Sequence, residues 1–90
     1  MSRWRLETAP AFDRSVRRSD ESVRRRVRAF LDDLCLLEDP RVRGKLLHGE
    51  LSGFRRYRIG DYRVIASIED SRLVIVAITL AHRSEVYRKR

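Results

Sequence analysis

The chain has 90 residues, of which 42% are hydrophobic, and a formal net charge of +8. This length suits one domain spanning residues 1–90, and the hydrophobic content excludes a disordered basic tail. The lone Cys35 excludes an intrachain disulfide, and no apolar run approaches the roughly 18 residues that span a bilayer. We therefore expect a cytoplasmic protein without a membrane partner, whose positive charge suits a polyanion.

The basic residues are almost all arginine, because only Lys45 and Lys89 are lysine among the 21. Arginine binds phosphate with a planar fork, whereas lysine is a hydrated point charge. GC-rich coding also favours arginine, and the absence of Asn and Gln fits that explanation. It does not explain where along the chain the arginines are placed.

The amino-terminal residues predict a strand followed by a helix. Residues 3–7 alternate, with Trp4 and Leu6 on one side and charged residues on the other, which favours a short strand with one buried face. Thr8 is a candidate cap for the helix that follows, and Pro10 fits its first turn. The apolar stripe of this helix consists of Phe12 and Val16.

A second, longer helix is predicted after Asp20, a candidate cap. Pro40 marks its end, since proline disfavours helical geometry in the preceding residue. The apolar residues at helical spacing are Val23, Val27, Phe30, Leu31, Leu34 and Leu37. The opposite face is interpreted as solvated, with contact to nucleic acid as the alternative; it carries Arg24, Arg25, Arg28, Asp32 and Asp33.

After a glycine-containing loop the period changes to two, which predicts a β-hairpin. Phe54–Ile59 and Tyr62–Glu69 flank Gly60-Asp61, a preferred two-residue turn. This register places Arg58 directly across from Arg63. The face expected under the helices comprises Tyr57, Ile59, Tyr62, Val64, Ala66 and Ile68. The other face carries Arg56, Arg58 and Arg63, although like charges normally avoid such positions.

Leu73–Ala81 is apolar on both faces, which predicts a central strand. With a turn near Asp70-Ser71, strand parity puts a further set of residues on the arginine face: Val74, Val76, Ile78, Leu80 and His82. The expected class is α+β with the order β-α-α-β-β-β and a short final turn or helix at 84–88. Two amino-terminal helices would pack on an antiparallel sheet whose last three strands form a meander.

The arginine face, joined by His82, Arg83 and Tyr87, suggests chemistry on RNA. RNA carries its own nucleophile, the 2′-hydroxyl, so a ribonuclease must align it, stabilise added negative charge and move protons. Arginines stabilise the charge, and a histidine or an acidified tyrosine can transfer the protons. Taken singly, His82 is more typical of a surface histidine and Tyr87 of a packing residue, so the hypothesis depends on their convergence.

Metal and cofactor chemistry finds no support in the sequence. His48 and His82 are far apart, Cys35 is isolated, and no set of carboxylates has ligand spacing. The glycines do not match a phosphate-binding loop. We therefore expect neither a metal nor a cofactor.

The motifs as a set resemble the RelE toxins of the bacterial RelE/ParE superfamily. They are K-L-x-x-G from Lys45, R-x-R-I-G-D-Y-R-V-I from Arg56 and H-R-S-E-V-Y from His82. The resemblance implies the microbial-RNase-like RelE/ParE fold and a metal-independent mRNA endonuclease acting in the ribosomal A site. It also implies a RelB-like antitoxin in a toxin–antitoxin hetero-oligomer.

Carried across position by position, the resemblance places Arg56, Arg63, Arg83 and Tyr87 where the family binds the scissile phosphate and assists proton transfer. His82 belongs to a frequent H-R variant and completes the expected catalytic set, where it would orient its neighbours. RNA binding falls to Lys45, Arg55 and Arg58. Two positions depart from the family pattern: Phe54 replaces a basic residue, for which Arg55 or Arg58 would substitute, and Ala66 replaces an aromatic one.

Strand parity predicts an apolar docking site for an antitoxin segment, formed by Val74, Val76, Ile78 and Leu80. Two other functions stay open. A ParE-like toxin would inhibit DNA gyrase by binding it, without cutting RNA, although such chains usually lack the H-R-x-x-x-Y arrangement. A basic nucleic-acid-binding module would bind RNA without catalysis.

Overall fold

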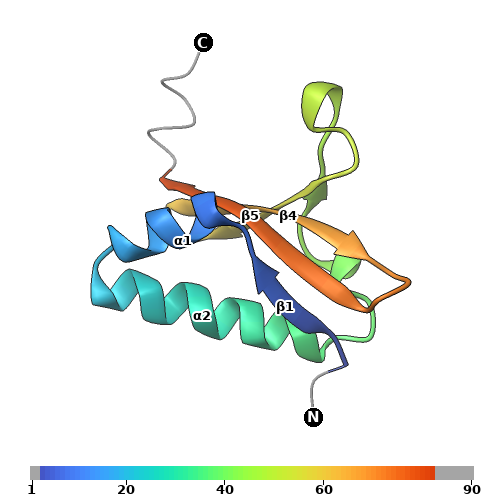
Figure 1. The fold of residues 1–90 in the computed structure, drawn as a ribbon, viewed down its shortest axis with the longest axis horizontal. Helices are drawn as coiled ribbons and strands as arrows, with labels where there is room; N and C mark the ends of the chain where they lie inside the picture. Colours follow the sequence, from blue (N-terminus) through green and yellow to red (C-terminus); the bar gives the residue numbers. More distant parts are fainter. Residues whose placement is uncertain (1–2, 83–90) are drawn as a thin grey trace.

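The computed structural model describes residues 3–82, which form two helices on one face of a five-stranded sheet (Figure 1). The elements are β1 (Arg5–Thr8), α1 (Pro10–Arg17), α2 (Glu21–Leu36), a 3₁₀ turn (Pro40–Val42), β2 (Lys45–Leu46), a second 3₁₀ turn (Gly49–Leu51), β3 (Arg55–Ile59), β4 (Tyr62–Glu69) and β5 (Val74–His82). The predicted α+β class, with two helices packed on the sheet, is confirmed. The predicted final turn or helix at 84–88 lies outside the described residues.

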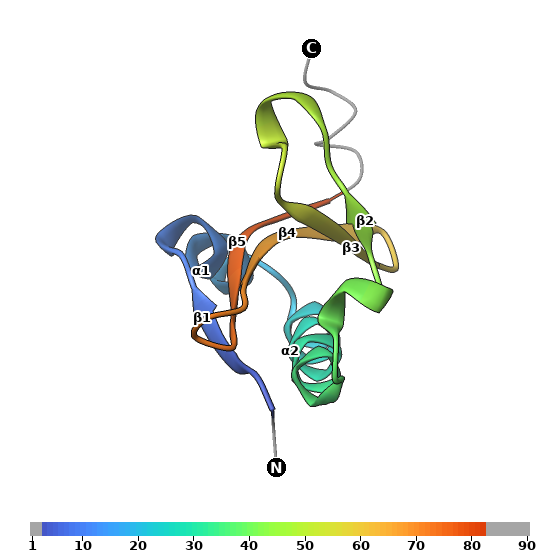
Figure 2. The same ribbon diagram turned by 90° about the vertical axis from the view of Figure 1, so that its right-hand side faces the viewer.

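The sheet has the order β1-β5-β4-β3-β2. β3, β4 and β5 form the predicted antiparallel meander, while β1 pairs with β5 in parallel and β2 pairs with β3 at the opposite edge. Figure 2 shows α2 beneath the sheet, and the segment between β2 and β3 projecting away from it. Within residues 3–82, the helices cover one face of the sheet, and the other face, called the open face below, carries no helix.

The first helix begins one residue later than the sequence predicts. Thr8 is still part of β1, where it pairs with Ala77, so Ala9 occupies the N-cap position. Pro10 stands in the first turn as predicted. The second helix begins after Asp20, which occupies the predicted N-cap position. The cap assignment to Thr8 was wrong because strand pairing holds that residue in the sheet.

The hydrophobic core lies between the helices and the covered face of the sheet. Val27, Leu31 and Leu34 of α2 are buried, with Cys35 beside them, and burial raises the pKa of the Cys35 thiol. The sheet contributes Tyr57, Ile59, Val64, Ala66, Ile75, Ala77 and Leu80. The predicted core face of the hairpin is therefore confirmed. Among the described residues, no helix is long and apolar enough to cross a bilayer.

A fully buried tyrosine connects the core to the chain segment after α2. Tyr57 has no exposed surface, and its hydroxyl donates a hydrogen bond to the Pro40 carbonyl at 3.0 Å. Its ring lies 5.9 Å from the ring of Phe30 on α2. Gly44, with φ of 83°, lies so close that a Cβ there would stand 2.7 Å from the Tyr57 ring. This packing fixes the approach of β2 to the edge of the sheet.

Candidate functional site

The β3–β4 hairpin has the register that the sequence predicts. Ile59 pairs with Tyr62, and Arg58 lies directly across from Arg63. Gly60 has φ of 60°, the left-handed conformation that a tight two-residue turn requires. Because the turn fixes the register, the side chains of Arg56, Arg58 and Arg63 lie on the face away from the helices.

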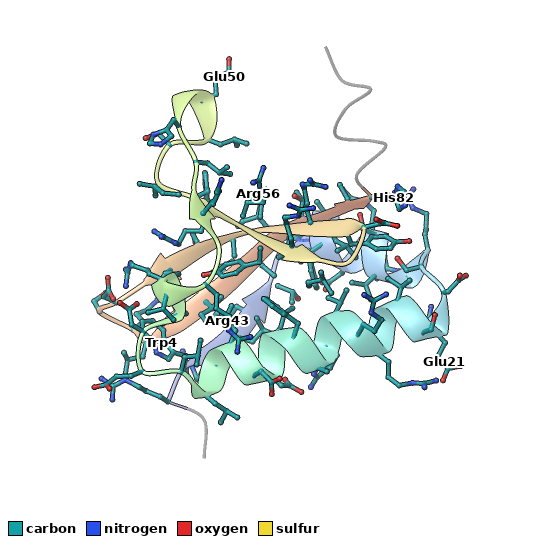
Figure 3. The ribbon with its side chains drawn as sticks, turned by 180° about the vertical axis from the view of Figure 1, so that it is seen from behind. Trp4, Glu21, Arg43, Glu50, Arg56 and His82 are labelled. Carbon is teal, nitrogen blue, oxygen red and sulfur yellow. The ribbon has the colours of Figure 1, made fainter. Side chains whose placement is uncertain are left out.

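A fourth cation joins this face through β2, a two-residue strand within the segment predicted as a glycine-containing loop. Lys45 on β2 pairs with Arg56 on β3, so three neighbouring strands present basic residues on the same side. Figure 3 shows Arg56 on the side of the sheet away from α2. We define the cationic face as Lys45, Arg56, Arg58 and Arg63.

The members of the cationic face differ in exposure. Arg63 is only 6% exposed, Arg56 is half-buried, and Arg58 and Lys45 are exposed. The Nε of Arg56 is buried, with no hydrogen-bond partner among the described residues. Within residues 3–82, Lys45, Arg56 and Arg58 also form no ion pair. Like charges at adjacent positions destabilise a sheet, and a bound phosphate would relieve that repulsion.

The last strand contains a β-bulge that reverses its parity. Ile65 pairs with Thr79, but Ala66 pairs with Ala77, which leaves Ile78 as an extra residue in β5. Residues beyond Ile78 therefore point to the opposite face from the one predicted. Strand parity does not reveal this extra residue, because Leu73–Ala81 is apolar on both faces.

His82 and Leu80 were therefore predicted on the wrong face. Leu80 lies across from Val64 and is 5% exposed, as part of the core. His82 lies across from Tyr62, and the two rings meet edge to face with centroids 5.1 Å apart. His82 also lines a small hollow of about 210 Å³ together with Arg18 and neighbouring residues of the α1–α2 turn. Figure 3 shows it at the end of β5, apart from Arg56.

The four residues predicted to form an apolar docking site do not make one exposed patch. Val74 and Val76 do lie on the open face, where they pair with Glu69 and Ser67, but Val74 is fully buried. Arg72 forms ion pairs with Glu69 on β4 and Glu7 on β1, so its side chain spans β5 near Val74. Leu80 belongs to the core, which leaves Val76 and Ile78 half-buried.

Arg55 lies on the side of the sheet that its parity predicts, away from the cationic face. It is half-buried, and its guanidinium donates a hydrogen bond to the Arg41 carbonyl at 3.4 Å. Arg83 and Tyr87 lie outside the described residues. In the part of the chain that the structure describes, no cluster of three or more His, Cys, Asp or Glu side chains has the arrangement of a metal site.

The family follows from a match that spans most of the chain. Residues 6–87 match the family described as the ParE toxin of the type II toxin–antitoxin system parDE. The chain belongs to this toxin family. Because the curated relatives with similar sequences are named RelE and RelG, the resemblance to the RelE/ParE superfamily is also confirmed.

Two curated relatives of this ParE-family chain come from Mycobacterium tuberculosis. Toxin RelE is 42% identical over 53 residues, which are 59% of this chain and 55% of that protein. Toxin RelG is 35% identical over 54 residues, 60% of this chain and 62% of that protein. The chain therefore matches somewhat more than half the length of each relative.

Solved structures show the same fold. A chain of the RelBE2 toxin–antitoxin complex from M. tuberculosis superposes with a TM-score of 0.83 at 26% identity, covering 93% of this chain and 95% of that one. A chain of the archaeal RelE–RelB complex from Pyrococcus horikoshii gives 0.72 at 28% identity, covering 92% and 97%. The isolated RelE toxin of Escherichia coli gives 0.72 at 23% identity, covering 96% and 93%. The predicted RelE/ParE fold is confirmed.

Proposed function

We propose that this chain is the toxin of a type II toxin–antitoxin module and cleaves mRNA in the ribosomal A site. The observation that carries the proposal is the cationic face, on which Lys45, Arg56, Arg58 and the nearly buried Arg63 come together on three adjacent strands. Adjacent cations on a sheet repel one another, and RNA supplies a phosphate for every nucleotide that would offset their charge.

In the proposed reaction the 2′-oxygen attacks the adjacent phosphorus. The new bond from 2′-oxygen to phosphorus forms as the bond to the 5′-oxygen breaks, leaving a cyclic phosphate and a 5′-hydroxyl. Arg56 and Arg63 stabilise the negative charge that accumulates on the phosphoryl oxygens. The family pattern assigns Arg83 to the same phosphate and Tyr87 to proton transfer. His82 lies against Tyr62 on the helix side, so we leave it out of the proton-transfer step.

The proposed partners follow from the complexes to which the chain is similar. Those structures pair a RelE protein with RelB, so we propose a RelB-like antitoxin that forms a hetero-oligomer with this chain. An acidic antitoxin segment would neutralise the toxin by covering the cationic face. Val76 and Ile78, half-buried beside that face, are the remaining apolar contacts for it.

A single-turnover cleavage assay tests the proposed reaction. We expect cleavage of mRNA on programmed ribosomes, and much slower cleavage of the same RNA without ribosomes, at a rate that EDTA leaves unchanged. A single 2′-deoxynucleotide at the scissile position should abolish that cut, because the nucleophile is then missing, while other cuts persist. Cleavage that continues at the deoxy position would contradict the mechanism.

The family match itself favours a second candidate, a toxin that binds DNA gyrase without cutting RNA, because the matching family is described as the ParE toxin. The two functions differ in what is damaged. Gyrase-dependent breaks in DNA, with mRNA intact, would support this candidate over the endonuclease.

A further inference from the structure

A cationic hollow of about 350 Å³ lies at the edge of the sheet, beside the cationic face. Its lining residues are Phe30, Arg43, Gly44, Lys45, Arg56, Tyr57 and Arg58. Four of these seven residues are basic and none is acidic. The volume falls at the lower end of the range for small-ligand sites.

The hollow is continuous with the cationic face, because Lys45, Arg56 and Arg58 belong to both. The hollow also includes Arg43, which is not part of the cationic face and lies in the chain segment between α2 and β2. Figure 3 shows Arg43 between α2 and the sheet, with Arg56 beyond the sheet. Positive charge therefore continues around the β2 edge, one or two strand spacings (about 5–10 Å) from the strand that carries Arg63.

The chemistry of the hollow combines charge with a flat surface. The Arg43 guanidinium lies 5.8 Å from the centre of the half-buried Phe30 ring, which orients it over that face. Among the described residues, Arg43 and Lys45 form no ion pair, although Arg25 and Arg28 on α2 pair with Glu21 and Asp32. Exposed cations beside an aromatic surface are the combination that binds single-stranded nucleic acid.

We propose that this hollow binds a nucleotide of the RNA next to the scissile phosphate. Arg43 and Lys45 would contact its phosphate, and the Arg43–Phe30 pair would face its base. The inference rests on the proposed endonuclease function, since it extends the same strand beyond the cleaved bond. It assigns to Arg43 a substrate-positioning role that no motif in the sequence indicates.

The test is the salt dependence of binding to a single-stranded RNA that is fully 2′-O-methylated and therefore cannot be cut. Each lost phosphate contact should reduce the magnitude of the slope of log K against log salt by about 0.7, so Arg43→Gln with Lys45→Gln, which removes both cations from one phosphate, should reduce it by about 0.7. Arg43→Lys should keep the slope of the wild type. The matched control is Arg25→Gln, which removes one exposed cation from α2 and should leave the slope unchanged.

Cleavage of unmodified RNA on ribosomes, measured in parallel, separates the two proposals. If the double variant keeps the wild-type slope while the wild type cleaves RNA, only the proposal that the hollow binds a nucleotide is overturned. A reduced slope with no cleavage by the wild type would support the hollow and overturn the endonuclease. If the wild-type protein does not bind the methylated RNA, the proposal for the hollow is overturned. The same conclusion follows if the variants weaken antitoxin binding but not RNA binding.

Discussion

Replacing Arg63 by alanine is expected to lower the single-turnover rate of RNA cleavage about 10²–10³-fold, the typical cost of removing one donor from a developing charge. Arg63 is 6% exposed on the open face and lies directly across from Arg58, so its guanidinium is held in place by the sheet. In cells the same substitution should abolish growth arrest. The measurement is the cleavage rate on programmed ribosomes.

The matched control for this prediction is Arg28→Ala, which removes an exposed arginine that pairs with Asp32 on α2. An exposed ion pair contributes about 0–1 kcal/mol, so this variant should fold, arrest growth and cleave RNA at the wild-type rate. Circular dichroism and urea unfolding check that Arg63→Ala is folded. A folded Arg63→Ala protein that cuts RNA as fast as the control would remove the basis for the proposed site.

The largest expected effect on stability comes from Tyr57→Ala, at about 3–5 kcal/mol of unfolding free energy, the range for removing a buried aromatic ring. Tyr57 has no exposed surface, packs against Phe30 and lies against Gly44. Because a small domain has about 5–15 kcal/mol in total, this change should remove a large part of its stability. Urea unfolding of the purified toxin, or of its antitoxin complex, measures the difference.

Tyr57→Phe distinguishes the contribution of the ring to stability from that of the hydroxyl, because it removes only the hydroxyl. It should cost about 1–3 kcal/mol, because the buried Pro40 carbonyl loses its donor. Burial raises the pKa of Tyr57 above its usual 10.0, so the neutral phenol is the form that folding favours. The stability that comes from keeping the Tyr57 phenol neutral is fully present below pH 10 and is lost as the pH rises through the pKa of Tyr57 in the folded protein. The Tyr57→Phe variant should not show this alkaline loss of stability. Equal alkaline sensitivity in both proteins would exclude Tyr57 as its source.

The hairpin was predictable because its signals are local. A Gly-Asp turn of two residues fixes which residues face each other, and alternation assigns the faces. Arg56, Arg58 and Arg63 were therefore placed correctly. Leu73–Ala81 carries no such alternation, since both of its faces are apolar, and nothing in it marks the extra residue at Ile78. The faces of Leu80 and His82 depended on that residue.

Long-range pairing was the other part that the sequence did not determine. β1 pairs in parallel with β5, so that Arg5 near the start of the chain lies beside Val74 near its other end. No local sequence pattern indicates this contact. β2 has only two residues, too few to show a period of two, so the pairing of Lys45 with Arg56 was not foreseen. The hollow that includes Arg43 follows from that pairing and from the packing of Tyr57 against Gly44.

The most direct test of the central claim is primer extension on mRNA from cells that express the wild-type chain or Arg63→Ala, with gyrase-dependent DNA breaks measured in the same cells. The cationic face predicts discrete cuts at codon positions with the wild type, none with Arg63→Ala, and intact DNA in both. Intact mRNA together with broken DNA in the wild-type cells would contradict it.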